Sequence, residues 1–238
     1  MTDTLPLSGK LALVTGASRG IGAATAVALA AAGAHVILTA RTGAALEEVE
    51  QRIHEAGGSA TIAPLDLIDG ESIGRLAQAI GGRWEALDIL VLNAATLGSL
   101  ASVPAIDAKE FARLLTLNVA APQAMIAAFD AMLRASGDAR VIGITSSVGA
   151  APRAYWGAYG ASKAALEVLV NAYGEEMKNI SAIRTHIVDP GATRTAMRAR
   201  AYPGEDPASV KTPETVASAL LDLVLADAPS GQRIRVNA

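Results

Sequence analysis

The fold of this chain is decided by the stretch Leu11-Ala12-Leu13-Val14-Thr15-Gly16-Ala17-Ser18-Arg19-Gly20-Ile21-Gly22. A short apolar run, a glycine turn and an alanine-rich segment follow one another there, which is the order strand, turn, helix. Glycine lets backbone amides approach a diphosphate, and the new helix directs its positive dipole end toward that charge. The stretch predicts a dinucleotide-binding turn, with these cofactor-binding candidates: Gly16, Ser18, Arg19, Gly20, Ile21 and Gly22.

Apolar runs alternate with segments of helical period along the rest of the chain. Such alternation favours a parallel sheet with helices on both faces. In open sheets of this kind, ligands bind at the carboxyl ends of the strands. The predicted strands are residues 11–14, 36–39, 60–65, 89–92, 141–144 and 183–188.

Composition excludes several classes of protein. The 238 residues are 51% hydrophobic and 18% charged, enough for a single large core, and we expect one domain over residues 1–238. The net charge of −3 leaves no basic excess for a nucleic acid. The chain has no cysteine, so disulfides and thiolate metal sites are excluded. The three histidines, His35, His54 and His186, are scattered, and we predict no metal site.

Residues 21–40 contain no charged side chain and are nominally long enough to cross a bilayer. Gly33 and His35 interrupt them, and Val36-Ile37-Leu38 has the composition of a buried strand. We therefore expect a helix followed by a strand, and no membrane span. Residues 1–10 are too polar and too short for a signal peptide, so a cytoplasmic location is expected.

The end of the second predicted strand bears on the choice of cofactor. An acidic residue at this place usually binds the ribose 2′-hydroxyl of NAD, whereas arginine accommodates the 2′-phosphate of NADP. The strand here ends Leu38-Thr39-Ala40-Arg41, without a carboxylate. Arg41 and Arg19 are candidates to clamp the phosphate through charge-assisted hydrogen bonds. They are otherwise solvated surface residues, and we predict NADP.

Polar groups and turns follow the remaining strands, and we expect them to converge on one crevice. Singly, each has the composition of an ordinary turn. Ser146 and Ser147, after the fifth strand, are the candidates for a hydroxyl at the reaction centre. The other cofactor-binding candidates at these strand ends are Asp66, Leu67, Asn93, Ala94, Pro190, Gly191, Thr193 and Thr195.

Tyr159 precedes Lys163 by four residues, so the two side chains share one face if both lie on a helix. A free phenol titrates near pH ~10, and a neighbouring ammonium favours the phenolate and lowers that pKa. The pair is a candidate general acid and base, and both residues are also candidate cofactor contacts.

These motifs together resemble those of the classical short-chain dehydrogenases/reductases, from about Leu7 to Thr195 and in a tail at residues 233–236. The family pattern Thr-Gly-x-x-x-Gly-x-Gly falls on Thr15 to Gly22, and Tyr-x-x-x-Lys falls on Tyr159 and Lys163. The segments after Thr193 are similar to a poorly characterised bacterial branch of oxidoreductases. The resemblance implies a three-layer, doubly wound Rossmann fold with a mostly or wholly parallel sheet of about seven strands.

The resemblance also implies an activity, the transfer of hydride between nicotinamide and a carbonyl or secondary alcohol. It assigns proton transfer to Tyr159, the substrate oxygen to Ser146, the nicotinamide ribose to Lys163 and a proton-relay water to Asn118. Its spacing selects Ser146 over Ser147. The usual Asn-Ala-Gly is Asn93-Ala94-Ala95 here, and the added methyl strains the backbone if Ala95 has a positive φ.

Several alternatives stay open. Residues 196–212 form a substrate lid or a plain surface connection. Trp156 and Tyr155 line a substrate pocket or pack between subunits of an expected homodimer or homotetramer. The whole chain is an NADP-dependent enzyme, an NAD-dependent alcohol dehydrogenase, or a dinucleotide sensor without catalysis.

Overall fold

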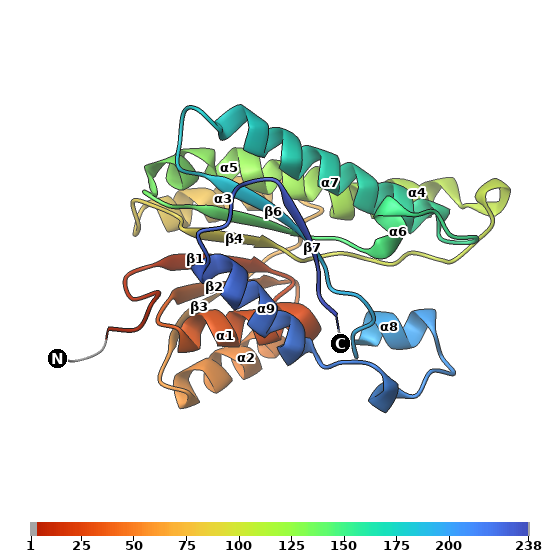
Figure 1. Ribbon diagram of the computed structural model, residues 1–238, viewed down its shortest axis with the longest axis horizontal. Helices are drawn as coiled ribbons and strands as arrows, with labels where there is room; N and C mark the ends of the chain where they lie inside the picture. The colour runs from red at the N-terminus through yellow and green to blue at the C-terminus, as the bar shows by residue number, and fades with distance from the viewer. Residues whose placement is uncertain (1–3, 238) are drawn as a thin grey trace.

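The computed structural model describes residues 4–237, which build one sheet of seven parallel strands in the order β3-β2-β1-β4-β5-β6-β7 (Figure 1). The order reverses between β1 and β4, the point at which ligands bind in doubly wound folds. The predicted fold is therefore confirmed. The strands are β1 (Leu11–Thr15), β2 (His35–Ala40), β3 (Ser59–Pro64), β4 (Ile89–Leu92), β5 (Arg140–Ile144), β6 (Arg184–Asp189) and β7 (Gln232–Arg235).

Helices cover both faces of the sheet and make three layers (Figure 1). On one face lie α1 (Gly20–Ala31), α2 (Gly43–Glu55) and α9 (Pro213–Leu225), and on the other α3 (Gly70–Gly81), α5 (Ala121–Ala135) and α7 (Gly157–Met177). The short elements are η1 (Val103–Ala105), α4 (Ala108–Leu115), the π-helical turn η2 (Thr116–Ala120), α6 (Ser147–Ala150), α8 (Ala196–Ala201) and η3 (Pro207–Ser209).

Two separate cores flank the sheet because side chains alternate along each strand. Val14 of β1 packs with α1, α2 and α9, whereas its neighbour Leu13 packs with α3, α5 and α7. Since both faces are covered, the central strands consist almost wholly of buried residues. This is why they are visible in the sequence as continuous apolar runs.

The uncharged segment 21–40 is divided between α1, a turn at Gly33 and β2, as expected. Within the described residues, one helical segment, 108–135, is long and apolar enough to span a membrane by length and composition. Its side chains Met125, Phe129 and Leu133 belong to the core cluster between α3, α5 and α7. Packing inside the protein therefore accounts for the apolar character of this helix.

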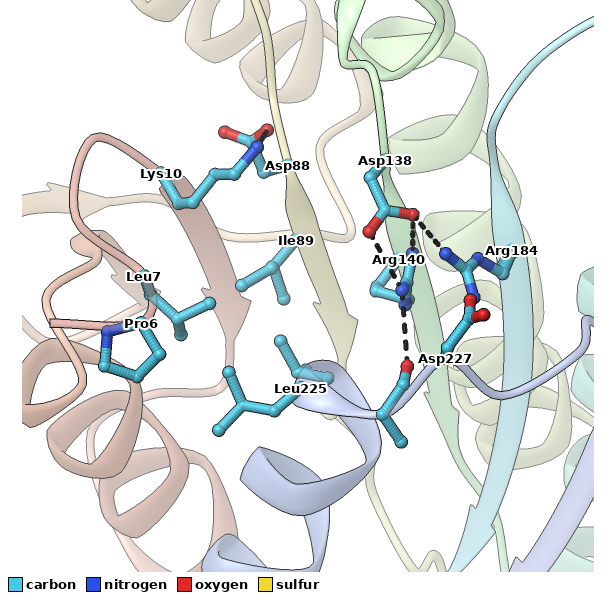
Figure 2. Close-up of a pocket in the computed structure, with 12 residues that line it drawn as sticks. Pro6, Leu7, Lys10, Asp88, Ile89, Asp138, Arg140, Arg184, Leu225 and Asp227 are labelled. Atoms are coloured by element: carbon cyan, nitrogen blue, oxygen red, sulfur yellow. Dashed lines mark hydrogen bonds and ion pairs between the residues drawn. The ribbon is translucent and has the colours of Figure 1, made fainter.

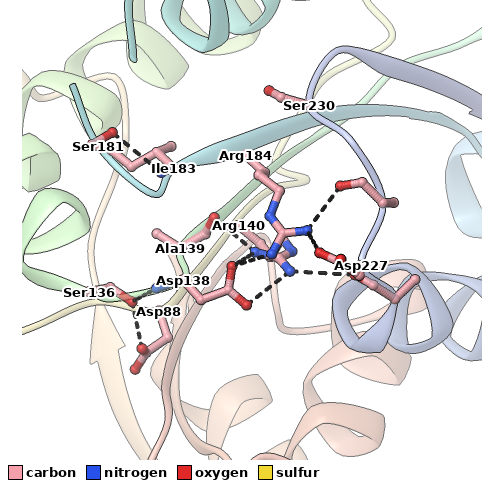
Figure 3. Close-up of polar contacts among 12 residues, drawn as sticks. Asp88, Ser136, Asp138, Ala139, Arg140, Ser181, Ile183, Arg184, Asp227 and Ser230 are labelled. Atoms are coloured by element: carbon pink, nitrogen blue, oxygen red, sulfur yellow. Dashed lines mark hydrogen bonds and ion pairs between the residues drawn. The ribbon is translucent and has the colours of Figure 1, made fainter. Parts of the chain in front are cut away.

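The amino ends of the central strands carry a network of paired charges (Figures 2 and 3). Arg140, at the start of β5, is bonded to Asp138, and Arg184, beside it on β6, donates to the same carboxylate at 2.7 Å. Asp88 lies 2.9 Å from Lys10 Nζ and accepts from Ser136 Oγ at 2.7 Å. A pocket of about 210 Å³ opens among these residues, at the end of the sheet opposite the glycine turn.

Candidate active site

The glycine turn joins β1 to α1 and has no room for side chains at two of its positions. Gly16 has φ +66°, and a Cβ there would lie 3.0 Å from the Ala94 Cα and the Asn93 Nδ2. A Cβ at Gly22 would lie only 2.3 Å from the Gly16 carbonyl oxygen. The turn is therefore a compact backbone cradle at the start of α1, of the kind that fits a diphosphate.

The ends of β1 and β4 are locked together by Thr15 and Asn93. The Thr15 hydroxyl donates to the Val91 carbonyl at 3.1 Å and accepts from the backbone amides of Asn93 and Ala94 at 2.9 and 3.0 Å. The Asn93 side chain donates to the carbonyls of Thr15 and Gly16. Asn93 thus holds the cradle in shape from beneath, and its amide donors are used within the protein.

Ala95, where the family pattern has glycine, does not carry the strain considered from the sequence. Tyr155 is the one non-glycine residue with positive φ in residues 4–237. The backbone at Ala95 therefore suits an L-amino acid, and the alanine is tolerated without a cost in conformational strain.

Arg19 and Arg41 lie at neighbouring strand ends. Thr15 of β1 is paired with Thr39 of β2, and the Ala17 amide donates to the Thr39 carbonyl at 3.0 Å. Both arginines are exposed, and neither makes an ion pair within the part of the chain that the structure describes. They are two uncompensated cations beside the cradle.

Asp66 and Leu67 follow β3. Asp66 is exposed and accepts the Ile68 amide at 3.1 Å, whereas Leu67 is buried in the core cluster with α3 and α5. Of the two, Asp66 presents its polar atoms to solvent at the edge of the crevice.

The turn after β6 reaches the glycine cradle. The Asp189 carboxylate accepts the Gly191 amide at 3.0 Å, and Thr193 Oγ1 donates to the Pro190 carbonyl at the same distance. Thr195 caps α8, and a Cβ built on Gly20 would lie 3.3 Å from its Cγ2. The tertiary structure therefore brings residues 190–195 against the start of α1, although about 170 residues separate them in sequence.

Two glycines let α6 pack closely on α7. A Cβ on Gly160 would lie 2.8 Å from the Val148 carbonyl oxygen, and one on Gly149 would lie 3.1 Å from Lys163 Cβ. Ser146, which precedes α6, and Ser147, its first residue, are both half-buried. The close packing brings the serine segment to the same helix face as Tyr159 and Lys163.

Tyr159 lies in a small apolar cluster at the carboxyl end of the sheet. Only 7% of the residue is exposed, and its neighbours are Leu97, Val148, Trp156 and Met197. Its hydroxyl lies 3.8 Å from Met197 Sδ. Burial, together with the negative charge of Asp189, raises the pKa of Tyr159.

Lys163 is 2% exposed, and its ammonium donates to the Ile144 carbonyl at 2.8 Å, at the end of β5. Burial lowers the pKa of Lys163 to about 8, against an opposing effect of the Glu167 carboxylate. The ammonium lies 5.7 Å from the centre of the Tyr159 ring.

The lowered phenol pKa expected from the spacing of Tyr159 and Lys163 is not found in this arrangement. Lys163 is directed at a carbonyl oxygen and not at the Tyr159 hydroxyl. Desolvation of the phenolate therefore dominates, and the pKa of Tyr159 is shifted upward.

Asn118 is completely buried in the π-helical turn between α4 and α5, a feature frequent at functional sites. Its Oδ1 accepts the Thr96 amide at 2.9 Å, and its Nδ2 donates to the Thr96 carbonyl and to Ser162 Oγ. The Ser162 hydroxyl donates in turn to the Tyr159 carbonyl at 2.7 Å. Asn118 therefore connects the segment after β4 to the helical turn that carries Tyr159.

Residues 196–212 form an excursion of the chain whose two ends lie next to each other. The Arg194 amide donates to the Lys211 carbonyl at 2.8 Å, which closes the two ends of the segment. Within it, Tyr202 stacks on Trp156 with ring centroids 5.8 Å apart, and its hydroxyl accepts from Arg153 at 2.6 Å. Met197 contacts the Tyr159 hydroxyl, so this segment lies against Tyr159 and not on a remote surface.

Sequence reasoning missed three residues of this region, Ser162, Glu167 and Thr145. Ser162 lies within the Tyr159–Lys163 motif, and its spacing of three residues from Tyr159 is a helical signal that pointed to a shared face. Glu167 is one turn beyond Lys163 on the same face, and Thr145 Oγ1 donates to its Oε1 at 2.6 Å. Nothing in the sequence marked that contact.

Comparison with known proteins identifies the family. The short chain dehydrogenase model matches residues 10–206. The uncharacterised oxidoreductase YciK of Escherichia coli K12 is 36% identical over 213 residues, which cover 88% of this chain and 84% of YciK.

Solved structures agree with that match. A Pseudomonas syringae protein provisionally described as a short-chain dehydrogenase superimposes with a TM-score of 0.95 at 37% identity, covering 100% of this chain and 98% of the other. A protein of Escherichia coli CFT073, solved in complex with NADPH, has a TM-score of 0.94 at 34% identity, covering 99% and 100%. This chain therefore belongs to the short-chain dehydrogenase family of oxidoreductases.

Proposed function

We propose that this protein is an NADP(H)-dependent oxidoreductase that interconverts a carbonyl compound and a secondary alcohol. The observation that carries the proposal is the placement of Tyr159 and Lys163 on one face of α7, both buried, against the serine segment that α6 packs beside them. The glycine cradle lies at the same carboxyl edge of the sheet, where β1 and β4 end. An acid and a dinucleotide cradle at one crevice are what this reaction requires.

The residues present fit a dinucleotide phosphate. Side chains are excluded at Gly16 and Gly22, so backbone amides line the cradle, and Arg19 and Arg41 supply two uncompensated positive charges beside it. Asp66, Leu67 and Ala94 would border the adenine side, and Pro190, Gly191, Thr193 and Thr195 the nicotinamide side. When bound, NADPH supplies the hydride that the protein itself lacks.

The side chains divide the remaining work. The neutral Tyr159 phenol donates its proton to the carbonyl oxygen, and the raised pKa of Tyr159 keeps that proton in place at neutral pH. Ser146 donates a hydrogen bond to the same oxygen, which stabilises the negative charge that develops there. Lys163 binds the nicotinamide ribose. Asn118 holds the segment after β4 and the Tyr159 turn in register.

The surroundings of Tyr159 favour particular substrates. Leu97, Val148 and Met197 offer no hydrogen-bonding group of ordinary strength next to the phenol. Ketones and aldehydes with apolar substituents are therefore the first choice. Met197 must leave the Tyr159 hydroxyl before a carbonyl oxygen takes its place, so residues 196–212 act as a lid in this proposal.

The test is the oxidation of NADPH by the purified protein, followed with a panel of apolar and polar aldehydes and ketones. Dissociation constants for NADPH and NADH are measured alongside by fluorescence. We expect turnover with at least one apolar carbonyl and tighter binding of NADPH. Tighter binding of NADH would favour an NAD-dependent alcohol dehydrogenase, and binding without turnover across the panel would favour a sensor.

A further inference from the structure

A charged cluster lies next to the segment of Ser146 and Lys163. Its centre is Glu167 of α7, one helical turn beyond Lys163. The Glu167 side chain is 15% exposed and accepts from Thr145 Oγ1 at 2.6 Å. Because Thr145 directly precedes Ser146, this hydrogen bond joins α7 to the segment that carries the catalytic serine.

Arg233 of β7 clamps Glu167 from the other side. Its Nε lies 3.2 Å from Glu167 Oε2, and its Nη2 donates to the Ser146 carbonyl at 3.4 Å. The same Nη2 lies 3.9 Å from Asp189, at the end of β6. Arg233 therefore contacts the ends of β5 and β6 and the middle of α7 at once.

Lys163 has no carboxylate within ion-pair distance among the described residues, although it is almost completely buried. Glu167 is the carboxylate whose negative charge acts on its ammonium. Gly149 brings the two side chains into one compact unit, since a Cβ there would lie 3.1 Å from both Glu167 Oε1 and Lys163 Cβ.

The elements packed around this cluster, α7, β6 and β7, contribute further charged and titratable groups. Tyr159 is the titratable neighbour of Lys163 on α7 itself. Arg233 and Arg235 come from β7, with Arg235 4.0 Å from the Asp189 carboxylate, and Asp189 comes from β6. Both arginines lie within 4.0 Å of Asp189. Glu167 is the group whose negative charge favours the protonated form of Lys163.

We propose that Glu167 is a positioning residue that keeps Lys163 protonated and holds the Ser146 segment against α7, with Thr145 and Arg233 fixing its carboxylate. The inference rests on the proposed function, because it concerns the residue assigned there to the nicotinamide ribose. An ammonium donates three hydrogen bonds and a neutral amine fewer, so the charge on Lys163 matters for binding.

The Glu167→Gln substitution tests this with almost no change in shape. Burial lowers the pKa of Lys163 to about 8. A full charge one helical turn away in a partly buried site shifts the pKa of a neighbouring group by about 0.5 to about 1. We expect the midpoint for Lys163 to fall by that amount in Glu167→Gln, and to be largely restored in Glu167→Asp.

Two measurements report this. One is an NMR titration of isotope-labelled lysine side chains in the cofactor-free protein from about pH 6 to about pH 11, with the Lys163 signal assigned by its loss in Lys163→Met. The other is the dissociation constant of NADPH over the same range. We expect binding by Glu167→Gln to weaken about two- to fivefold near pH 8, with a smaller loss near pH 6. Glu175→Gln, an exposed carboxylate on the same helix, is the control.

A Lys163 midpoint in Glu167→Gln that coincides with the wild-type midpoint would overturn the inference, as would weakened NADPH binding that is uniform across pH. If the wild-type protein does not bind NADPH, the proposed function fails. The NMR titration still decides the effect of Glu167 on Lys163 in that case. Circular dichroism confirms that each variant is folded before it is compared.

Discussion

The two ends of this sheet use the same kinds of residue in opposite ways. At the amino ends, Arg140 and Arg184 share the carboxylate of Asp138 (Figure 3), and Lys10 pairs with Asp88 (Figure 2), so these cations are paired within the protein. At the carboxyl ends, Arg19 and Arg41 have no partner among the described residues, and Lys163 is buried against a carbonyl. The charges at the amino ends are therefore balanced within the protein. The carboxyl ends also hold a pair, Arg233 with Glu167, but they leave Arg19 and Arg41 available for the negative charge of a cofactor in the proposed function.

This difference in charge pairing says more about where a ligand binds than the presence of a pocket does. The pocket of about 210 Å³ at the amino ends is lined by Lys10, Arg140 and Arg184, and by an equal number of aspartates (Figure 2). Such a balanced set has no net charge with which to attract an ionic ligand. The paired charges at the amino ends hold neighbouring strands together, whereas Arg19 and Arg41, unpaired among the described residues, lie beside the glycine turn.

The largest expected effect tests the reactive end. Tyr159→Phe removes the hydroxyl proposed as the proton donor and leaves the ring and its apolar contacts in place. We expect kcat to fall about 10³-fold, while the dissociation constant of NADPH changes less than about twofold. Steady-state kinetics and fluorescence titration measure the two quantities. Near-native turnover would remove Tyr159 from the mechanism.

A smaller effect is expected from the paired end. Arg140→Met keeps a long side chain in the buried position but removes one of the two cations that pair with Asp138. Breaking a buried pair is strongly destabilising, but Asp138 is half exposed, so we expect a loss of about 2 kcal/mol in the free energy of unfolding. Urea denaturation measures this loss. Activity per folded molecule should be unchanged, and a loss of kcat in the folded variant would contradict the comparison.

The unpaired arginines come next. In the proposed function each arginine donates a charge-assisted hydrogen bond to the 2′-phosphate, so Arg41→Met and Arg19→Met should each raise the dissociation constant of NADPH about tenfold. The constant for NADH should stay the same because NADH lacks that phosphate. Arg134→Met, which breaks a surface pair with Asp130, is the matched control. Equal effects on both cofactors would show that the arginines act elsewhere.

The smallest effect at neutral pH concerns His186 of β6, which is fully buried with both ring nitrogens unpartnered in the described structure. Burial, then the charges of Arg140 and Arg184, lowers its pKa from 6.5 to about 4. The unfolded chain therefore binds more protons between these values, and stability must fall as the pH drops from 6.5 toward 4.

His186→Leu should lack that part of the acid sensitivity and differ little from the native protein at pH 7. Thermal melting between about pH 4 and pH 7 measures the difference. If the melting temperature of the variant falls below pH 6.5 as steeply as that of the native protein, the acid sensitivity comes instead from the carboxylates of the amino-end network.

Most of the fold was visible in the sequence. Strands such as 141–144 and 89–92 are buried on both faces and therefore appear as uninterrupted apolar runs. The glycine spacing revealed the cradle, because its positions tolerate no Cβ. The spacing of Tyr159 and Lys163 placed both on one helix face, since local geometry alone decides that relation.

The direction in which the pKa of Tyr159 is shifted was not predictable from that spacing. It depends on Leu97, Val148 and Met197, which surround the phenol from three other segments, and on the orientation of Lys163 toward Ile144. The clamp of Glu167 by Arg233 joins residues 66 apart, and the Thr15–Asn93 lock joins residues 78 apart. No local pattern records such contacts.

By itself the sequence determined the order of strands and helices, the glycine cradle and the acid–lysine pair, because these follow from side-chain periodicity and from short-range backbone geometry. Only the tertiary structure decided which charges find partners. The amino-end arginines are neutralised by aspartates that the sheet brings beside them, while Arg19, Arg41 and Lys163 have no carboxylate of residues 4–237 in ion-pair contact. The desolvation and Coulombic energies that separate a structural ion from a functional one depend on distances that only folding sets.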